Sequence, residues 1–290
     1  MREVSVAVTQ MACDWDREAN VERAIGLVRE AAARGANVVL VQELFETPYF
    51  PVEERADRFA LARPLEGHPT IEQMAELARE LAVVLPVSFF ERAGNAHFNT
   101  VAMLDADGSM LGVYRKSHIP DGPGYEEKYY FNPGDTGFRV WKTRYANIGV
   151  AICWDQWFPE CARAMALQDA ELILYPTAIG DEPIPDYSDT KDHWQRVMQG
   201  HAAANMIPVL ASNRIGVEKS ESTSLRFYGS SFITDATGEK LVEASRDQQQ
   251  VLTATFDLDE LRRARASSGF FRDRRADLYG GLLKLDGTPG

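Results

Sequence analysis

Ile-Gly-Val-Ala-Ile-Cys, at residues 148–153, is the stretch of this 290-residue chain that decides its fold class. The short apolar run is typical of a buried strand, and the residues at 154–160 are typical of a turn that enters a helix. An unpaired cysteine is often just a small buried side chain. Cys153, however, lies where a strand opens into a loop, and open α/β sheets bind their ligands at such strand ends.

Two other apolar runs end in residues that complement a thiol. Residues 38–42 lead into Glu43, and residues 110–115 lead into Lys116. Each of these charges alone is more often an exposed loop residue than a catalytic one. A carboxylate, an ammonium and a thiol at three such positions together favour a catalytic set.

The rest of the chain alternates between strand and helix patterns, without a linker that would divide it. We therefore predict a single domain with an α/β fold and a mixed sheet. The expected helices lie at 17–34, 70–81 with Thr70 as a possible N-cap, a segment ending near 168, 192–206 and 258–265. The expected strands lie at 4–9, 38–42, 83–90, 98–104, 110–115, 148–153, 172–175, 209–212, 230–234 and 249–256.

Composition excludes several classes of partner. The chain has 43 acidic and 31 basic residues and a formal charge of -12, which argues against a nucleic-acid surface. No stretch approaches the ~18 apolar residues of a membrane span. The three cysteines, Cys13, Cys153 and Cys161, are odd in number and lack Cys-x-x-Cys spacing, so neither a disulfide framework nor a zinc site is expected. We expect a cytoplasmic protein that acts on a small molecule.

The three candidate residues suggest acyl-transfer chemistry. A thiol has an unperturbed pKa of about 8.5 and needs a base or a positive neighbour to act as a nucleophile at neutral pH. Glu43 could take the thiol proton and later activate water, while Lys116 would favour the thiolate and stabilise an oxyanion together with the backbone N–H of Trp154. This chemistry requires no metal and no cofactor.

These segments resemble the carbon-nitrogen hydrolases of the nitrilase superfamily, whose catalytic set is Glu, Lys and Cys in that order. The matching segments are Val-Gln-Glu43-Leu-Phe-Glu, Tyr-Arg-Lys116-Ser-His-Ile-Pro and Ala-Ile-Cys153-Trp-Asp-Gln-Trp-Phe-Pro-Glu. The resemblance implies an αββα sandwich, with a domain core at about 4–265 of the single domain 1–290. It also implies self-association into a homodimer or larger homo-oligomer, with the extension 266–290 at a subunit interface.

The same resemblance brings a second glutamate, Glu127, which would hold Lys116 and the substrate amide by hydrogen bonds. Its neighbour Glu126 could be confused with it, and both could be ordinary loop acids.

Within the superfamily, the likeness is closest to the branch that cleaves N-carbamoylputrescine to putrescine, carbon dioxide and ammonia in polyamine metabolism. The segments that carry it lie at 121–131, 200–206, 227–232 and 271–275, and Ala276 stands where proline is expected. This likeness implies a cationic ureido amine as substrate and a thioester on Cys153.

A distant acid would then bind the ammonium, with Glu182 favoured by resemblance and Asp181 as the second choice. Tyr125, Trp154 and Tyr130 would form walls around the aliphatic stem, although core packing is an equally ordinary interpretation of these aromatic residues.

Two alternatives remain open at this stage. The same chemistry could act on an N-carbamoyl β-amino acid or an ω-amide, whose carboxylate would require an arginine such as Arg196 or Arg214. A catalytically silent binding subunit would be expected to lack at least one of the three strand-end residues, and all three are present. The sequence also leaves open which nitrogen departs first.

Overall fold

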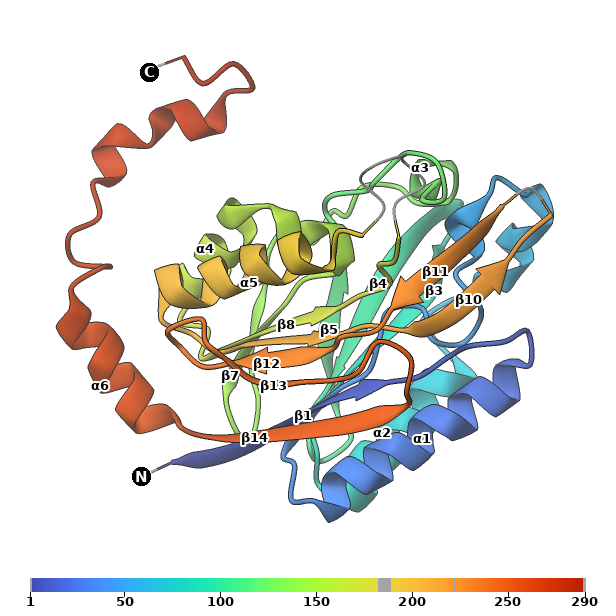
Figure 1. Cartoon of the computed structure of the whole chain (residues 1–290), viewed down its shortest axis with the longest axis horizontal. Coiled ribbons are helices and arrows are strands. Elements are labelled where there is room, and N and C mark those ends of the chain that lie inside the picture. The colour runs from blue at the N-terminus through green and yellow to red at the C-terminus, as the bar shows by residue number, and fades with distance from the viewer. Residues whose placement is uncertain (1, 182–188, 222, 289–290) are drawn as a thin grey trace.

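Two facing sheets with helices on both outer sides form the body of the protein (Figure 1). The computed structural model describes residues 2–181, 189–221 and 223–288. The strands are β1 (Glu3–Gln10), β2 (Val38–Leu40), β3 (Leu85–Ala93), β4 (Ala96–Leu104), β5 (Met110–Arg115), β6 (Val140–Lys142), β7 (Asn147–Val150), β8 (Leu172–Pro176), β9 (Val209–Ser212), β10 (Ile215–Lys219), β11 (Ser224–Tyr228), β12 (Phe232–Thr234), β13 (Lys240–Glu243) and β14 (Gln250–Asp257). The helices are α1 (Arg17–Ala33), α2 (Pro69–Leu81), α3 (Glu127–Tyr130), α4 (Pro159–Leu167), α5 (Lys191–Asn205) and α6 (Leu258–Ser268), with 3₁₀ turns η1 (Phe50–Val52), η2 (Ala56–Leu61), η3 (Cys153–Trp157), η4 (Ala276–Leu278) and η5 (Gly280–Leu283).

The first sheet carries α1 and α2 on its outer face. Its strands run in the order β14-β1-β2, and a parallel bridge between Val38 and Val84 extends it into β3-β4-β5. The apolar stripe of α1 packs with that of α2 in one buried cluster, and the Asp16 carboxylate caps α1 by accepting a hydrogen bond from the Ala19 N–H at 3.0 Å. Thr70 is not the N-cap of α2. His68 occupies that position, because Pro69 is the first residue of the helix.

The second sheet carries α4 and α5 on its outer face. Its order is β13-β12-β9-β8-β7-β6, with β7, β8 and β9 parallel and the other pairs antiparallel. Apolar side chains of both sheets, among them Val8, Leu40 and Leu174, share one buried core between the layers. The predicted αββα sandwich with mixed sheets is therefore confirmed.

Several element boundaries differ from the sequence prediction. β2 ends at Leu40 and β7 at Val150, so Glu43 and Cys153 lie in the loops that follow their strands. The short elements β6, β13 and α3 were not predicted, because segments of 3 or 4 residues show no measurable periodicity.

The C-terminal segment departs from the sandwich after α6 (Figure 1). It places several exposed apolar side chains outside the domain core, namely Phe270, Leu278, Leu282, Leu283 and Leu285. No helix within the described ranges has both the length and the apolar character to cross a membrane.

Gly134 packs tightly against the backbone at the end of β5. Its N–H donates to the Lys116 carbonyl at 2.8 Å, and an added Cβ would lie 2.0 Å from the Arg115 carbonyl oxygen. Gly134→Ala should therefore lower the free energy of unfolding by about 1–3 kcal/mol in urea denaturation. Gly122→Ala is the matched control, because its Cβ would meet no atom within 4 Å. Equal midpoints for the two variants would contradict this packing.

Candidate active site

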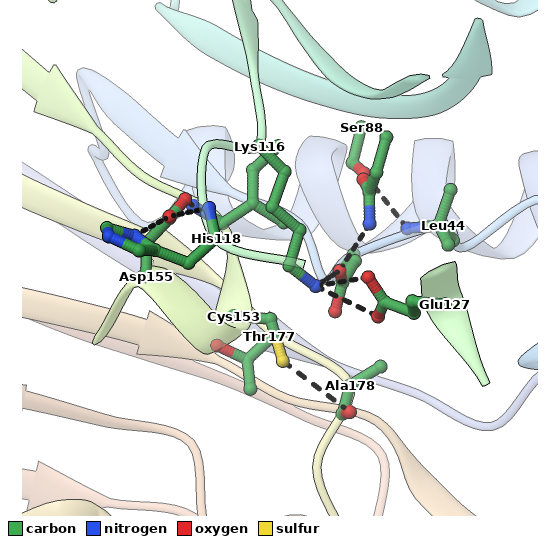
Figure 2. Close-up of polar contacts among 12 residues, drawn as sticks. Leu44, Ser88, Lys116, His118, Glu127, Cys153, Asp155, Thr177 and Ala178 are labelled. Carbon is green, nitrogen blue, oxygen red and sulfur yellow. Dashed lines mark hydrogen bonds and ion pairs between the residues drawn. The ribbon is translucent and has the colours of Figure 1, made fainter. Parts of the chain in front are cut away.

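The ammonium of Lys116 is the centre of a buried polar cluster at one end of the sandwich. Its Nζ donates to Glu43 Oε1 at 3.0 Å and to Glu127 Oε1 and Oε2 at 2.9 and 2.7 Å. All three side chains are fully buried. Figure 2 shows the Lys116 amine pointing at Glu127, with the Cys153 sulfur nearby. The structure thus brings together the acid, amine and thiol that the sequence singled out.

The turn that presents Glu43 is fixed by hydrogen bonds to its backbone. Leu44 has a φ of 47°, which is the left-handed region, and its N–H donates to Ser88 Oγ at 3.0 Å. The guanidinium of Arg214 donates through Nη2 to the carbonyls of Glu43 and Leu44 at 2.8 and 3.0 Å. These contacts determine the direction in which the Glu43 carboxylate points.

Arg214 also connects this turn to the second glutamate. Its Nη1 donates to Glu218 Oε1 at 2.8 Å, and Glu218 in turn accepts from the Tyr49 N–H. The Tyr49 hydroxyl then donates to Glu127 Oε1 at 2.6 Å. A single chain of contacts therefore fixes both carboxylates that face Lys116.

The two arginines of the carboxylate-substrate alternative differ in their contacts. Arg214 is fully buried, and its two terminal nitrogens are occupied by Glu218 and by main-chain carbonyls. Arg196 is exposed on α5, and its Nε donates to the Asp192 carbonyl. Arg214 is therefore not available to bind a substrate carboxylate.

Cys153 occupies a strained turn between β7 and α4. It opens η3 with a φ of 44°, retains 5% exposure, and its Sγ donates weakly to the Ala178 carbonyl at 3.7 Å. Asp155 fixes this turn by accepting from the Ile152 N–H at 3.0 Å. The same carboxylate accepts from the Tyr114 hydroxyl at 2.7 Å. It also accepts from the His118 N–H at 2.9 Å (Figure 2). Asp155 thereby joins the cysteine turn to the segment around Lys116.

Burial determines the protonation of the cluster. It raises the pKa of the Cys153 thiol well above its usual range, Glu43 and Glu127 raise it further, and Lys116 only partly opposes them. Burial alone would lower the pKa of Lys116, but the two carboxylates outweigh it and raise that pKa. Burial also raises the pKa of Glu127 to about 7 against the opposing effect of Lys116. The net upward shift keeps the resting sulfur protonated, although Lys116 itself favours the thiolate, as expected.

The remaining predicted residues differ in their exposure and in their hydrogen-bond partners. Trp154 is 37% exposed, and the Tyr125 hydroxyl accepts from the Gly180 N–H at 2.9 Å. Tyr130 is buried, and its hydroxyl donates to the Glu53 carbonyl at 2.6 Å, so it has the packing role that the sequence also allowed. Of the two neighbouring glutamates, Glu127 is buried at Lys116, whereas Glu126 is partly exposed.

Asp181 belongs to a separate cavity of about 510 Å³. That cavity is lined by charged residues of both signs, including Asp189, Arg226 and Arg246, and none of the three candidate catalytic residues lines it. Glu182, the favoured acid for a substrate ammonium, lies outside the described residues. Within the part of the chain that the structure describes, no group of three or more His, Cys, Asp or Glu side chains is placed to hold a metal ion.

Comparisons with known proteins agree with this geometry. The family model "Carbon-nitrogen hydrolase" matches residues 5–266. The chain is 59% identical over 291 residues to N-carbamoylputrescine amidase of Arabidopsis thaliana, covering 99% of this chain and 97% of the relative. It is 53% identical over 285 residues to citrullinase of Francisella tularensis, covering 98% and 99%. A crystal structure of a carbon-nitrogen hydrolase from Helicobacter pylori superposes with a TM-score of 0.92 at 38% identity, covering 98% and 99% of the two chains.

Arg214 provides a stability test of the buried network. Arg214→Met should lower the free energy of unfolding by about 3–5 kcal/mol in urea denaturation, because it leaves Glu218 buried without its cation. Arg214→Met combined with Glu218→Leu should recover part of that loss. Arg29→Met, which breaks an exposed pair with Glu80, is the control and should leave the midpoint in place. If the two single arginine variants unfolded at the same urea concentration, the structural role of Arg214 would be refuted.

Proposed function

Because this chain belongs to the carbon-nitrogen hydrolase family and is a hydrolase of carbon–nitrogen bonds, we propose that it cleaves N-carbamoylputrescine. The products are putrescine, carbon dioxide and ammonia. The observation that carries the proposed chemistry is the ammonium of Lys116, buried between Glu43 and Glu127 beside the Cys153 thiol. The full-length similarity to plant N-carbamoylputrescine amidases supports the choice of substrate.

The first half of the reaction forms a thioester. The Cys153 thiol gives its proton to Glu43 as the sulfur attacks the ureido carbon, and the C=O bond becomes a C–O⁻ bond. The Lys116 ammonium and the Trp154 backbone N–H stabilise this oxyanion. Collapse of the tetrahedral species breaks one C–N bond, and the departing nitrogen takes the proton back from Glu43. Since the resting sulfur is a neutral thiol, a base is required for this step.

The second half releases the enzyme. Glu43 accepts a proton from water as the oxygen attacks the thioester carbon, and the C–S bond then breaks with return of that proton to the sulfur. The resulting carbamic acid loses carbon dioxide and liberates the second amine. Either order of departure of the two nitrogens gives the same three products. Glu127 keeps Lys116 in place throughout and binds the substrate amide.

We assign substrate choice to an acid that binds the end of the substrate opposite the ureido group. The terminal ammonium of N-carbamoylputrescine needs an anionic partner, and Glu182 has that role in our proposal. Asp181 is the second choice, because its cavity is lined by other residues than the proposed catalytic ones. Tyr125 and Trp154 flank the aliphatic stem.

We further propose that the enzyme works in the cytoplasm as a homodimer or larger homo-oligomer. Another subunit would cover the exposed apolar side chains of the segment after α6, of which Leu282, Leu283 and Leu285 are the most exposed. All three cysteines are free thiols, as in proteins of a reducing compartment.

A second candidate substrate is citrulline, because a citrullinase is among the similar proteins. Citrulline carries the same ureido group but ends in an α-amino acid, whose carboxylate calls for a cationic partner. Arg214 cannot supply it, because its terminal nitrogens are already occupied. The higher identity to N-carbamoylputrescine amidase, 59% against 53% for citrullinase, makes N-carbamoylputrescine the preferred substrate.

Ammonia release by the purified protein tests the proposed function. We expect turnover of N-carbamoylputrescine with a kcat/KM at least about tenfold above that for citrulline, for an N-carbamoyl β-amino acid or for an ω-amide, since an unpaired buried charge costs at least this much. Cys153→Ala should remove turnover and leave the thermal unfolding curve unchanged. Cys161→Ala, which changes another buried thiol, on α4, is the matched control and should remain active. Activity of the Cys153→Ala variant would rule out the mechanism, and preference for an acidic substrate would rule out the substrate.

The acid that binds the substrate ammonium can be found by steady-state kinetics. Glu182→Gln should raise KM for N-carbamoylputrescine by about 10–100-fold, the value of one charge-assisted contact, with little change in kcat. Asp181→Asn should change KM less, because this carboxylate faces the separate cavity. An unchanged KM in both variants would show that neither carboxylate binds the substrate ammonium.

A further inference from the structure

Asn99 is a buried amide on β4 to which the steps above give no role. Its side chain has no exposed surface, and its Nδ2 donates to Glu43 Oε1 at 2.6 Å. Its own main-chain carbonyl accepts from the Lys116 N–H at 2.9 Å. One residue in the middle of a strand thus contacts both the proposed base and the backbone of the proposed oxyanion ligand.

The two oxygens of the Glu43 carboxylate differ in their surroundings. Oε1 accepts from Asn99 Nδ2 and from Lys116 Nζ, at 2.6 and 3.0 Å. Oε2 is buried and has no hydrogen-bond partner among the described residues. Leaving a buried acceptor without a donor costs free energy. This indicates that Oε2 forms a hydrogen bond with a group that is present only during the reaction. The thiol proton and the hydrolytic water are such partners.

We propose that Asn99 is a positioning residue that holds Glu43 by Oε1, so that Oε2 remains the one oxygen available to take protons from the thiol and from water. The inference deepens the proposed function, because it takes Glu43 to be the base. Asn99 acts through Glu43 and is not assigned a contact with the substrate.

A neutral donor suits the charges around Glu43. The ionisable groups facing it are Lys116, Glu127, Tyr49, Cys153 and the paired Arg214. Two carboxylates share one ammonium here. The Asn99 amide stabilises the carboxylate form of Glu43 without adding a charge that would compete for Glu127. An apolar side chain of the same size would lack this donor.

Asn99→Leu removes the donor and keeps the number of side-chain heavy atoms. We expect kcat to fall by about 10–100-fold at neutral pH, and the acid limb of kcat to move upward by about one pH unit, because the ionised form of the base loses a hydrogen bond. KM should change little. The profile is recorded on whichever ureide or amide the wild type hydrolyses fastest, so an error in the proposed substrate leaves this test intact.

Asn99→Asp provides a second variant of nearly identical shape, in case the leucine variant does not fold. At high pH the introduced carboxylate repels Glu43 and cannot donate to it. At low pH the introduced side chain is protonated and can again donate a hydrogen bond to Oε1. The pH optimum of this variant should therefore lie below that of the wild type, and an unchanged optimum would overturn the proposal.

Thr100→Val is the matched control on the same strand. Thr100 is equally buried, and its hydroxyl donates to the Glu91 carboxylate at 2.7 Å, away from Lys116. This variant should lose stability in thermal unfolding but keep the wild-type pH profile. If Asn99→Leu lowered kcat by the same factor at every pH, as a general loss of structure would, Asn99 would have no positioning role.

Discussion

The interaction on which this structure depends is the buried ion cluster of Lys116 with Glu43 and Glu127. An ammonium without solvent contact is stable only when anions surround it, and here the anions come from the loop after β2 and from α3. The cluster therefore constrains three segments that are distant in sequence. Because its two carboxylates offset the charge of Lys116, the lysine alone does not ionise the thiol, and the chemistry has to pass through a base.

The sandwich explains how these segments meet. Glu43 and Lys116 follow strands of the first sheet, whereas Cys153 and Ala178 follow strands of the second. Two buried side chains then connect the layers at this end: Asp155 ties the cysteine turn to the lysine segment, and Arg214, which follows β9, ties the glutamate turn to the second sheet. The site is thus held by polar contacts between the sheets as much as by the apolar core.

The sequence could predict the three central residues because each follows an apolar run, and strand ends are easy to recognise. It could not predict the roles of Asn99, Arg214 or Asp155, because their partners depend on strand register and on the fold of loops. Asn99 interrupts an ordinary strand pattern, and nothing in that pattern identifies Glu43 as its partner. Glu127 was found only through the family resemblance, because a helix of 4 residues has no period of its own.

The most direct test of the central claim is intact-protein mass spectrometry after rapid acid quench of the enzyme mixed with N-carbamoylputrescine. The account predicts a covalent adduct on Cys153 in the wild type and none in a folded Lys116→Met variant. Without the ammonium, the two buried carboxylates lose the cation that compensates them, and the oxyanion loses its ligand. Formation of the adduct by Lys116→Met at the wild-type rate would contradict the claim that the Lys116 cluster activates the thiol.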